Sequence, residues 1–329
     1  MTIAKACGAK AWGVALVAAA MASQAALAAD PVTIKLGRQT AAEEPLWVMM
    51  AKPDLAPNLN KVYKLDITAF RASDATFKAY EGGQVDAATA SANAAIVAAS
   101  KGLDFKIVAS LSLESKDGSF TPYAVKADSP IKTIADLKGK TVGINGYRTS
   151  IELWARAALV KGGLNPDRDV NWAVIPFPAM AEAVRTGKVD IAGMPELFSK
   201  GPLGKGEIRP LFSSKTGVPQ DEELIVMIMR PALMKEQPAA VKAFLADLAT
   251  VTKWYIAHPK EGRQAFLDAK LVAMPPEVLF SLTDYKRDPN ARPNVQALEN
   301  QQDLMLKLGF QEKKIDIKKL VDLSLSPAK

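Results

Sequence analysis

Two well-separated stretches of this chain, residues 66–91 and 171–195, share one pattern of residue types. Each reads as a short apolar strand, a turn after Phe, an Ala-rich helix that ends at Gly, and a Val-Asp pair that opens a second strand. The shared core is Gly83–Asp86 in the first copy and Gly187–Asp190 in the second. Such a βαβ unit is typical of doubly wound α/β domains. The spacing is too long for a solenoid, whose period is roughly 20–50 residues. We therefore expect two similar lobes with a cleft between them; two βαβ units of one large sheet are the alternative.

The N-terminal segment has the three parts of a secretory signal peptide. Lys5 and Lys10 provide a basic start, residues 11–20 form an apolar run, and Ala26–Ala28 is an A-x-A cleavage signal. The apolar run is too short for a stable membrane-spanning helix. We therefore predict that residues 1–28 are a cleaved signal peptide rather than a membrane anchor.

Cysteine content and charge narrow the chemistry of the mature chain. The single cysteine, Cys7, lies inside the signal, so the mature protein lacks disulfides, thiol nucleophiles and zinc–thiolate sites. The formal net charge of +7 becomes +5 when Lys5 and Lys10 leave with the signal. This excess is scattered, without a basic block that carries interleaved aromatic residues, which argues against a nucleic-acid partner. We expect neither a cofactor nor a metal site.

Strands and helices alternate along the mature chain, as in α/β proteins. The apolar run Glu222–Met229 predicts a strand that carries the chain back to the first lobe, so we expect two crossings, near 122–127 and 219–226. The region after Pro231 is mostly helical, with apolar residues at helical spacing. The predicted domains are a discontinuous first lobe of residues 29–122 and 222–329 and a second lobe of residues 123–221.

Several short motifs occur together in one order along the chain. They are Pro45–Val48, Gly83–Ala87, Ser129–Ile131 with Ala135–Lys140, Val142-Gly143 and Gly187–Asp190. In this order the chain resembles the solute-binding proteins of ABC importers for nitrate, sulfonates, taurine and the thiamine pyrimidine precursor. The resemblance covers essentially the whole mature chain. It implies a bilobal α/β periplasmic-binding-protein fold, with two hinge strands and a helical C-terminal region on the first lobe. It also implies a periplasmic monomer without catalysis, whose partners are a small-molecule ligand and an inner-membrane permease with its ATPase.

The best candidate for a ligand site follows the predicted strand Thr141–Asn145. In open α/β sheets, ligands bind beyond the carboxyl ends of strands, where helix N-termini meet, and the helix Ile151–Lys161 starts here. Its first-turn amides and dipole favour an anion. The alternative is that Thr149 and Glu152 form a capping box that occupies two of these amides. The candidate contacts in this segment are Gly146, Tyr147, Arg148, Thr149 and Ser150.

Other strand ends are expected to face this segment across the cleft. For several of these side chains the alternative to ligand contact is a purely structural role. At Ser91 and Asn93 this role is a turn and a helix N-cap. The candidates are Gln39, Thr40, Trp47, Phe70, Arg71, Ser91 and Asn93 in the first lobe and Pro178 and Glu196 in the second.

The charge of the ligand is predicted from the charged residues near these loops. Arg38, Arg71 and Arg148 favour an organic anion, a sulfonate or a carboxylate, aromatic ones included, because both groups accept a bidentate guanidinium contact. Glu44 and Glu196 support the alternative, a neutral or cationic heterocycle such as a pyrimidine precursor. Glu44 also departs from the family pattern, which argues against a familiar small alkanesulfonate.

An enzyme on the same bilobal fold, such as a deaminase or a pyrimidine synthase, is the competing class of function. His258 is the single histidine of the chain and directly precedes Pro259, at a predicted helix end where a surface position is favoured. A Ser-His-Asp set is therefore not expected, and a metal site with several histidine ligands cannot be built. The sequence also contains neither a Gly-rich phosphate-binding loop nor the fingerprint of a nicotinamide-binding site. We therefore expect a binding protein with no catalytic residues.

Overall fold

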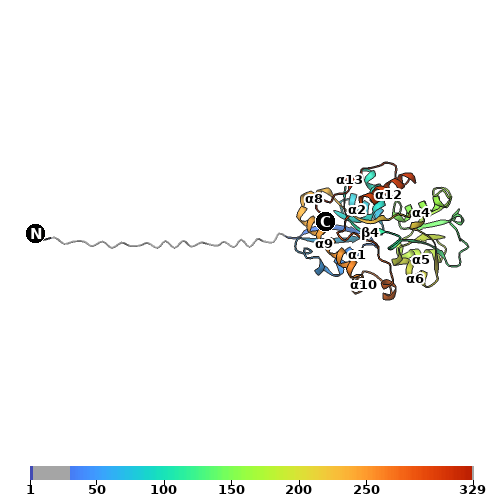
Figure 1. Cartoon of the computed structure of the whole chain (residues 1–329), viewed down its shortest axis with the longest axis horizontal. Coiled ribbons are helices and arrows are strands. Elements are labelled where there is room, and N and C mark those ends of the chain that lie inside the picture. The colour runs from blue at the N-terminus through green and yellow to red at the C-terminus, as the bar shows by residue number, and fades with distance from the viewer. Residues whose placement is uncertain (3–29, 328–329) are drawn as a thin grey trace. The chain divides into compact units, whose positions relative to one another are not determined.

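The computed structural model describes residues 1–2 and 30–327. The predicted signal peptide falls almost entirely on residues 3–29 and so lies outside the described residues. The chain divides into two compact units, Met1–Asp30 and Pro31–Lys329, and the second unit contains every element discussed below (Figure 1). Within residues 30–327 no helix combines the length and the apolar character that crossing a membrane requires.

The first sheet has the strand order β2-β1-β3-β10-β4. Strand β1 runs parallel to both β2 and β3, whereas β10 runs antiparallel to β3 and β4. All residues of β3 and β10 are buried, because strands covered by helices on both faces do not alternate between apolar and polar residues. The bounds are β1 Val32–Arg38, β2 Tyr63–Ala69, β3 Ala87–Ser91, β4 Lys106–Glu114 and β10 Glu222–Met229.

The second sheet repeats this arrangement with the strand order β7-β6-β8-β5-β9. Strand β6 is parallel to β7 and β8, and β5 is antiparallel to β8 and β9. The bounds are β5 Pro122–Lys126, β6 Thr141–Ile144, β7 Asn171–Val174, β8 Ile191–Gly193 and β9 Ile208–Ser213.

The two sequence repeats occupy equivalent places in the two sheets. Strands β3 and β8, which follow the Val-Asp pairs, are each third in their sheet. The amide of Asp86 donates to the carbonyl of Lys35 over 2.8 Å, and that of Asp190 donates to Thr141 over 3.0 Å, in the matching register. The expectation of two similar lobes is confirmed, and the alternative of a single large sheet is wrong.

Helices cover both sheets, and α4, α5 and α6 lie at one end of this unit while α8 and α9 lie at the other (Figure 1). The helices that follow β1, β2 and β3 of the first sheet in the sequence are α1 Glu44–Ala51, α2 Ser73–Glu81 and α3 Ala92–Ser100, with a 3-10 turn at Pro53–Leu55. Those of the second lobe are α4 Ser150–Lys161, α5 Phe177–Arg185, α6 Glu196–Gly204 and α7 Ser214–Gly217, with a 3-10 turn at Ala135–Leu137.

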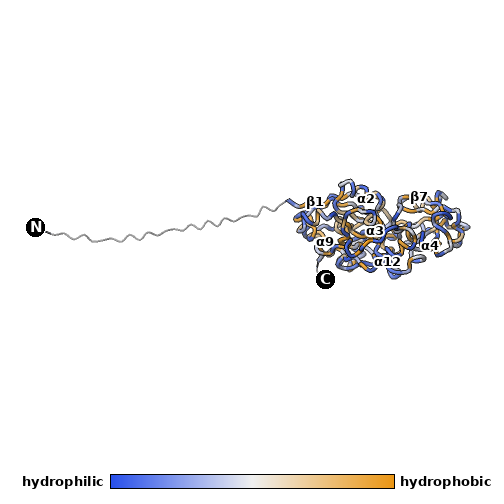
Figure 2. Tube along the Cα trace, turned by 90° about the horizontal axis from the view of Figure 1, so that it is seen from above, coloured by the Kyte–Doolittle hydropathy of each residue, from blue (hydrophilic) through white to orange (hydrophobic). Residues whose placement is uncertain are grey.

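The C-terminal region is helical and packs on the first lobe. Helix α9 contacts α1 and β2, and α12 lies beside α3 and β10 (Figure 2). The buried stripe of α9, from Val241 through Phe244 to Tyr255, is core, as its spacing predicts. The helices are α8 Pro231–Glu236, α9 Pro238–Ala257, α10 Pro259–Asp268, α11 Pro276–Phe280, α12 Val295–Lys307 and α13 Ile317–Leu320.

The chain passes between the lobes twice, through residues 115–121, between β4 and β5, and through residues 218–221, between α7 and β10. The first crossing precedes its predicted place near 122–127, because Pro122–Lys126 is already a strand of the second sheet. The second passage ends where β10 begins, and β10 belongs to the first sheet. This agrees with the prediction that Glu222–Met229 is a strand that returns the chain to the first lobe. The sheet membership of these strands supports lobe boundaries near residues 122 and 222, which we keep as a proposal.

Candidate ligand-binding site

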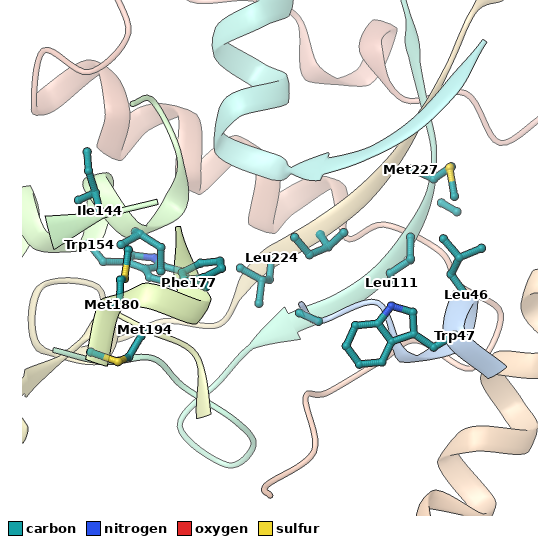
Figure 3. Packing of buried hydrophobic residues seen from close by; sticks show 14 of the residues in the cluster. Leu46, Trp47, Leu111, Ile144, Trp154, Phe177, Met180, Met194, Leu224 and Met227 are labelled. Atoms are coloured by element: carbon teal, nitrogen blue, oxygen red, sulfur yellow. The ribbon is translucent and has the colours of Figure 1, made fainter. Parts of the chain in front are cut away.

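A small cavity of about 40 Å³ lies where the two lobes face each other; we call it the inner cavity. Both lobes supply its walls. Phe177 and Leu224, which Figure 3 shows among the buried hydrophobic side chains, are two of its apolar lining residues. Among the described residues, every side chain that lines it is uncharged. Its lining is Gln39, Thr40, Ala41, Ala42, Ser73, Ser91, Thr121, Asn145, Thr149, Ser150, Ile151, Trp154, Phe177, Pro195, Leu224, Ile225 and Tyr285.

Helix N-termini from both lobes converge on the inner cavity. Helix α2 begins at Ser73, α3 follows Ser91, α4 begins at Ser150 and α5 begins at Phe177. Each of these helices follows the carboxyl end of a parallel strand, the place where α/β sheets bind ligands. Their positive dipole ends and first-turn amides therefore point at the same small space.

The N-terminus of α4 is open at the expected place. Thr149 Oγ1 contacts Asn145 Oδ1 at 3.1 Å and the carbonyl of Gly146 at 2.9 Å instead of capping the helix. The Glu152 carboxylate accepts the amide of Arg148 over 2.5 Å, not the amide of the N-cap residue. The capping box that the sequence offered as an alternative is thus not formed.

Hydrogen bonds from residues outside the cavity fix the positions of several lining side chains. Asn93 Nδ2 donates to Ser150 Oγ over 3.0 Å and so joins α3 of one lobe to α4 of the other. Gln301 Nε2 in turn donates to Asn93 Oδ1 over 3.1 Å. Gln39 donates its side-chain amide to Thr76 Oγ1 over 2.8 Å. Asn93 therefore positions a lining hydroxyl and is itself absent from the lining.

A buried carboxylate lies beside this network. Glu43 is fully buried, and its Oε1 accepts the Gln39 amide over 2.8 Å and the Thr89 hydroxyl. Burial raises the pKa of Glu43 to about 7, because transfer out of water disfavours the charged form. Within the described part of the chain, Glu43 Oε2 has no hydrogen-bond partner.

A second, larger cavity of about 520 Å³ adjoins the first; we call it the mouth cavity. Thr40 lines both cavities. Of the two cavities, the predicted contacts Trp47 and Pro178 line the mouth cavity and not the inner cavity. The full lining is Arg38, Thr40, Trp47, Pro178, Leu197, Phe198, Gly201, Pro202, Lys205, Leu271, Val272, Ala273, Met274, Pro275 and Val278.

The structure thus brings part of the predicted site together. Five of the predicted contacts line the inner cavity, namely Gln39, Thr40, Ser91, Thr149 and Ser150. Gly146 is buried against the first lobe, where a Cβ would lie 3.1 Å from that of Ala72. Phe70 packs beside Gly37 and the core of the first lobe. Whether these residues contact a ligand stays a prediction.

The predicted arginine contacts point elsewhere. Arg148 donates to the carbonyl of Phe310 over 2.6 Å and lies over its ring at 5.1 Å. Arg71 bonds Asp74 over 2.5 Å and the carbonyl of Asn145 over 3.1 Å. Tyr147 is 51% exposed. None of these three side chains lines any of the cavities described here.

The two predicted carboxylates also have partners. Glu44 pairs with Arg287. Glu196 accepts the backbone amide of Thr283 over 2.8 Å and its hydroxyl over 3.3 Å. Both carboxylates border a third small cavity beside Trp47, and neither lines the inner one. They are therefore occupied within the protein rather than presented to the inner cavity.

Sequence reasoning missed several lining residues. Thr121 lies in the first crossing and Tyr285 in the C-terminal region, where no local motif marks a ligand site. Asn145 directly follows β6 and could have been found from the strand-end rule that selected Gly146. Trp154 belongs to the core and also borders the cavity.

A group of buried carboxylates lies at the crossings. Glu114 and Glu222 are register partners on β4 and β10 and are both fully buried. Glu114 accepts the Ser214 hydroxyl over 2.5 Å, and Glu222 accepts the Trp154 indole N–H over 2.6 Å. Burial raises the pKa of both glutamates to about 7, against the opposing effect of Lys215. Side chains of both lobes therefore meet at these two carboxyl groups.

His258 lies away from the cavities. It is the C-cap residue that follows α9, its ring stacks on Trp254 with centroids 5.1 Å apart, and its Nδ1 lies 2.9 Å from the Trp254 carbonyl. Among the described residues no group of three or more His, Cys, Asp or Glu side chains could hold a metal ion.

The arrangement of two lobes around a cavity is that of the periplasmic binding proteins. The alkanesulfonate-binding protein SsuA of Xanthomonas axonopodis pv. citri, bound to MOPS, aligns with a TM-score of 0.71 at 18% identity, over 89% of this chain and 99% of that one. The periplasmic nitrate-binding protein NrtA of Synechocystis PCC 6803 aligns with a TM-score of 0.70 at 16% identity, over 90% and 87% of the two chains. At these identities the likeness shows the fold.

Sequence comparison gives the family. Residues 64–262 match the model described as NMT1/THI5 like, and the chain belongs to this family. A protein of Haemophilus influenzae assigned to thiamine biosynthesis is 32% identical over 151 residues, which is 43% of this chain and 44% of the relative. The chain thus spans less than half the length of the curated relatives it matches.

Proposed function

We propose that this chain is the solute-binding component of an ABC importer and that it captures a small organic anion, a sulfonate or a carboxylate, between its lobes. One observation carries the proposal. The inner cavity is walled by both lobes and lined by hydroxyl and amide groups at the N-termini of helices that follow parallel strands. A ligand held there would contact both lobes and would stabilise the closed arrangement through its differential affinity for it.

Neutral donors carry the recognition in this proposal. Hydroxyls of Ser73, Ser91 and Ser150 and the open first turn of α4 surround the space. The Thr149 hydroxyl also lines it, but its proton is donated to Asn145 Oδ1 and the Gly146 carbonyl. Amides at a helix N-terminus, with the dipole behind them, bind an anion without a guanidinium partner. The bidentate arginine contact expected from the sequence is therefore not part of the proposed site.

The proposed location is the periplasm, and the proposed partners are an inner-membrane permease and its ATPase. The N-terminal sequence has the pattern of a cleaved signal. The names of the structural relatives, alkanesulfonate-binding and nitrate-binding, support a transport role. Such a protein would act as a monomer and would not transform its ligand.

A neutral heterocycle such as a pyrimidine precursor is the second candidate ligand. The lining of the inner cavity is uncharged and includes the rings of Trp154, Phe177 and Tyr285, which suit a flat polar ring. The relative assigned to thiamine biosynthesis supports this candidate.

A thermal-shift screen of the mature chain tests the proposal. The probes are alkane- and arylsulfonates, carboxylates, nitrate and pyrimidines, because a ligand that binds only the native state raises the midpoint of unfolding. Calorimetric titration of each hit at two salt concentrations separates an anion, whose affinity falls with salt, from a neutral ring. A shift with pyrimidines alone would replace the anion by the heterocycle. Absence of a shift with every probe would contradict the proposed site.

A further inference from the structure

The inner cavity has room for only a small chemical group. A cavity needs about 10–15 Å³ by this kind of measure to hold one water molecule, so about 40 Å³ accommodates a few waters or a headgroup of similar size. An organic anion with a larger body would need a second space. The mouth cavity, at about 520 Å³, lies within the usual range for ligand pockets.

The two cavities are neighbours that share walls. Thr40 lines both. Phe177 of the inner cavity stacks on Phe198 of the mouth cavity, with ring centroids 5.3 Å apart and planes at 16°. Pro178 of the mouth directly follows Phe177 in the first turn of α5. A molecule with its headgroup in the inner cavity would therefore extend past Thr40 into the mouth.

The walls of the mouth cavity are mainly apolar and come from both lobes. Helix α6 supplies Leu197 and Phe198, and the segment between α10 and α11 supplies Leu271 and Val272. These four side chains are only partly buried although they pack against the core. Apolar surface left in contact with water favours an apolar group that covers it.

The charge at the mouth has one sign. Arg38 and Lys205 line the cavity, and no carboxylate does so among the described residues. Arg38 also donates to the carbonyl of Gln39 over 3.0 Å, next to Thr40. A cavity lined by one sign of charge raises the local concentration of oppositely charged ligands, so this entrance suits an anion with an apolar body.

We propose that the mouth cavity is a second subsite of the same ligand site and holds the apolar body of the ligand. The ligand is then an amphipathic organic anion whose hydrocarbon or aromatic body is several carbons long, and not a bare oxyanion or methanesulfonate. This inference rests on the proposed function, since it assumes that an anionic headgroup occupies the inner cavity.

A chain-length series tests the second subsite. Linear alkanesulfonates and the matching carboxylates, from one to eight carbons, are titrated calorimetrically into the mature protein. We expect the affinity to rise about two- to fourfold for each methylene that enters the cavity, until the mouth is filled. Leu197→Ser on α6 and Val272→Ser between α10 and α11 each place a hydroxyl in the lining of the mouth cavity. Both should flatten this rise and leave the affinity for the one-carbon anion within about twofold.

The matched control is Val160→Ser. Val160 is 48% exposed on α4 of the second lobe and lies outside both cavities, so the rise with chain length should persist in this variant. Equal affinities for one- and eight-carbon anions in the wild type would overturn the second subsite and leave the proposed function standing. A rise that both mouth variants retain would also overturn it. Binding of no anion of any length would overturn the proposed function itself.

Discussion

At the residue scale, hydroxyls and amides rather than charges give the inner cavity its polarity. Ser150 illustrates how: its hydroxyl oxygen accepts a bond from Asn93 and lines the cavity from the first turn of α4. Because Asn93 fills one acceptor position, the hydroxyl proton of Ser150 remains a donor for a ligand oxygen. The fully buried Glu43 lies behind this lining and not within it.

We predict that Ser150→Ala weakens binding of a confirmed anionic ligand by about 1.5–3 kcal/mol, or roughly ten- to a hundredfold, because a charge-assisted hydrogen bond is lost. Calorimetric titration measures the change. Ser281→Ala is the control, since the Ser281 hydroxyl bonds only the carbonyl of Val278 on an exposed turn. Equal affinities of Ser150→Ala and the wild type would remove Ser150 from the site.

The buried carboxyl groups at the crossings predict how stability depends on pH. With its pKa raised to about 7 from an ordinary value of 4.5, Glu222 keeps a proton in the folded state that the unfolded chain has already released. The contribution of Glu222 to the free energy of unfolding therefore falls as pH rises through this window. For one fully buried group the fall is on the order of 3 kcal/mol.

Glu222→Gln should remove this contribution, because an amide does not titrate and its oxygen can still accept the Trp154 N–H. We expect the free energy of unfolding by urea to fall less steeply between pH 5 and 8 in this variant than in the wild type. Glu182→Gln, at an exposed pair with Arg185, provides the comparison. Parallel curves for Glu222→Gln and the wild type would show that Glu222 is ionised in the folded protein.

At the element scale, α6 connects the lobes. Glu196 in its first turn reaches the backbone amide and hydroxyl of Thr283, which lies beyond α11 in the C-terminal region. Helices α6 and α11 are also in contact. The carboxylate that was expected to touch a ligand instead joins the second lobe to the region that packs on the first.

We predict that Glu196→Ala weakens binding of any cleft ligand about three- to tenfold, corresponding to about 0.5–1.5 kcal/mol for one hydrogen bond. The loss should fall mainly on the dissociation rate, because the closed arrangement is what the bond stabilises. Stopped-flow dissociation of a bound ligand measures it. Glu182→Ala on α5, whose carboxylate bonds only within its own helix, should dissociate like the wild type. An unchanged rate in Glu196→Ala would mean that the contact does not hold the lobes closed.

At the scale of the whole molecule, part of the second lobe is buried in the core of the first. Leu153 of α4 is fully buried in a cluster formed otherwise by first-lobe and C-terminal residues, among them Ile96 and Val226. Leu159, on the same helix, is buried in the other core cluster, which contains Val142 and Ile144 of its own lobe. The same helix therefore buries one leucine in the first lobe and another in its own lobe.

We predict that Leu153→Ala shifts the lobes toward an open arrangement. Small-angle scattering should show a larger radius of gyration than in the wild type without ligand, and saturating ligand should reduce the difference. Leu159→Ala should instead lower the free energy of unfolding by about 2–5 kcal/mol with no change in the radius of gyration. The same radius in both variants, with and without ligand, would contradict a role of Leu153 in closure.

The two-lobe architecture could be predicted from the residues alone. The repeated helix stop at Gly and the Val-Asp strand start are local signals, so they predicted β3 and β8 and their equivalent places. The apolar run of β10 and the helical spacing of α9 were likewise readable, because burial on both faces or on one stripe leaves a periodic trace. The strand-end rule also located the inner cavity, through residues such as Ser91 and Ser150.

Which side chains line the cavity could not be predicted in this way, because it depends on contacts between distant segments. Arg148 has a left-handed backbone with φ of 62° and contacts Phe310 from the distant C-terminal region, and neither fact has a signal in the residues around it. Tyr285 likewise lines the cavity, and the backbone amide of Thr283 donates to the carboxylate of Glu196. Both contacts come from the C-terminal region, far away in the sequence. The direction of a loop side chain depends on which distant segment packs against it, and that is fixed only when the lobes and the C-terminal helices come together.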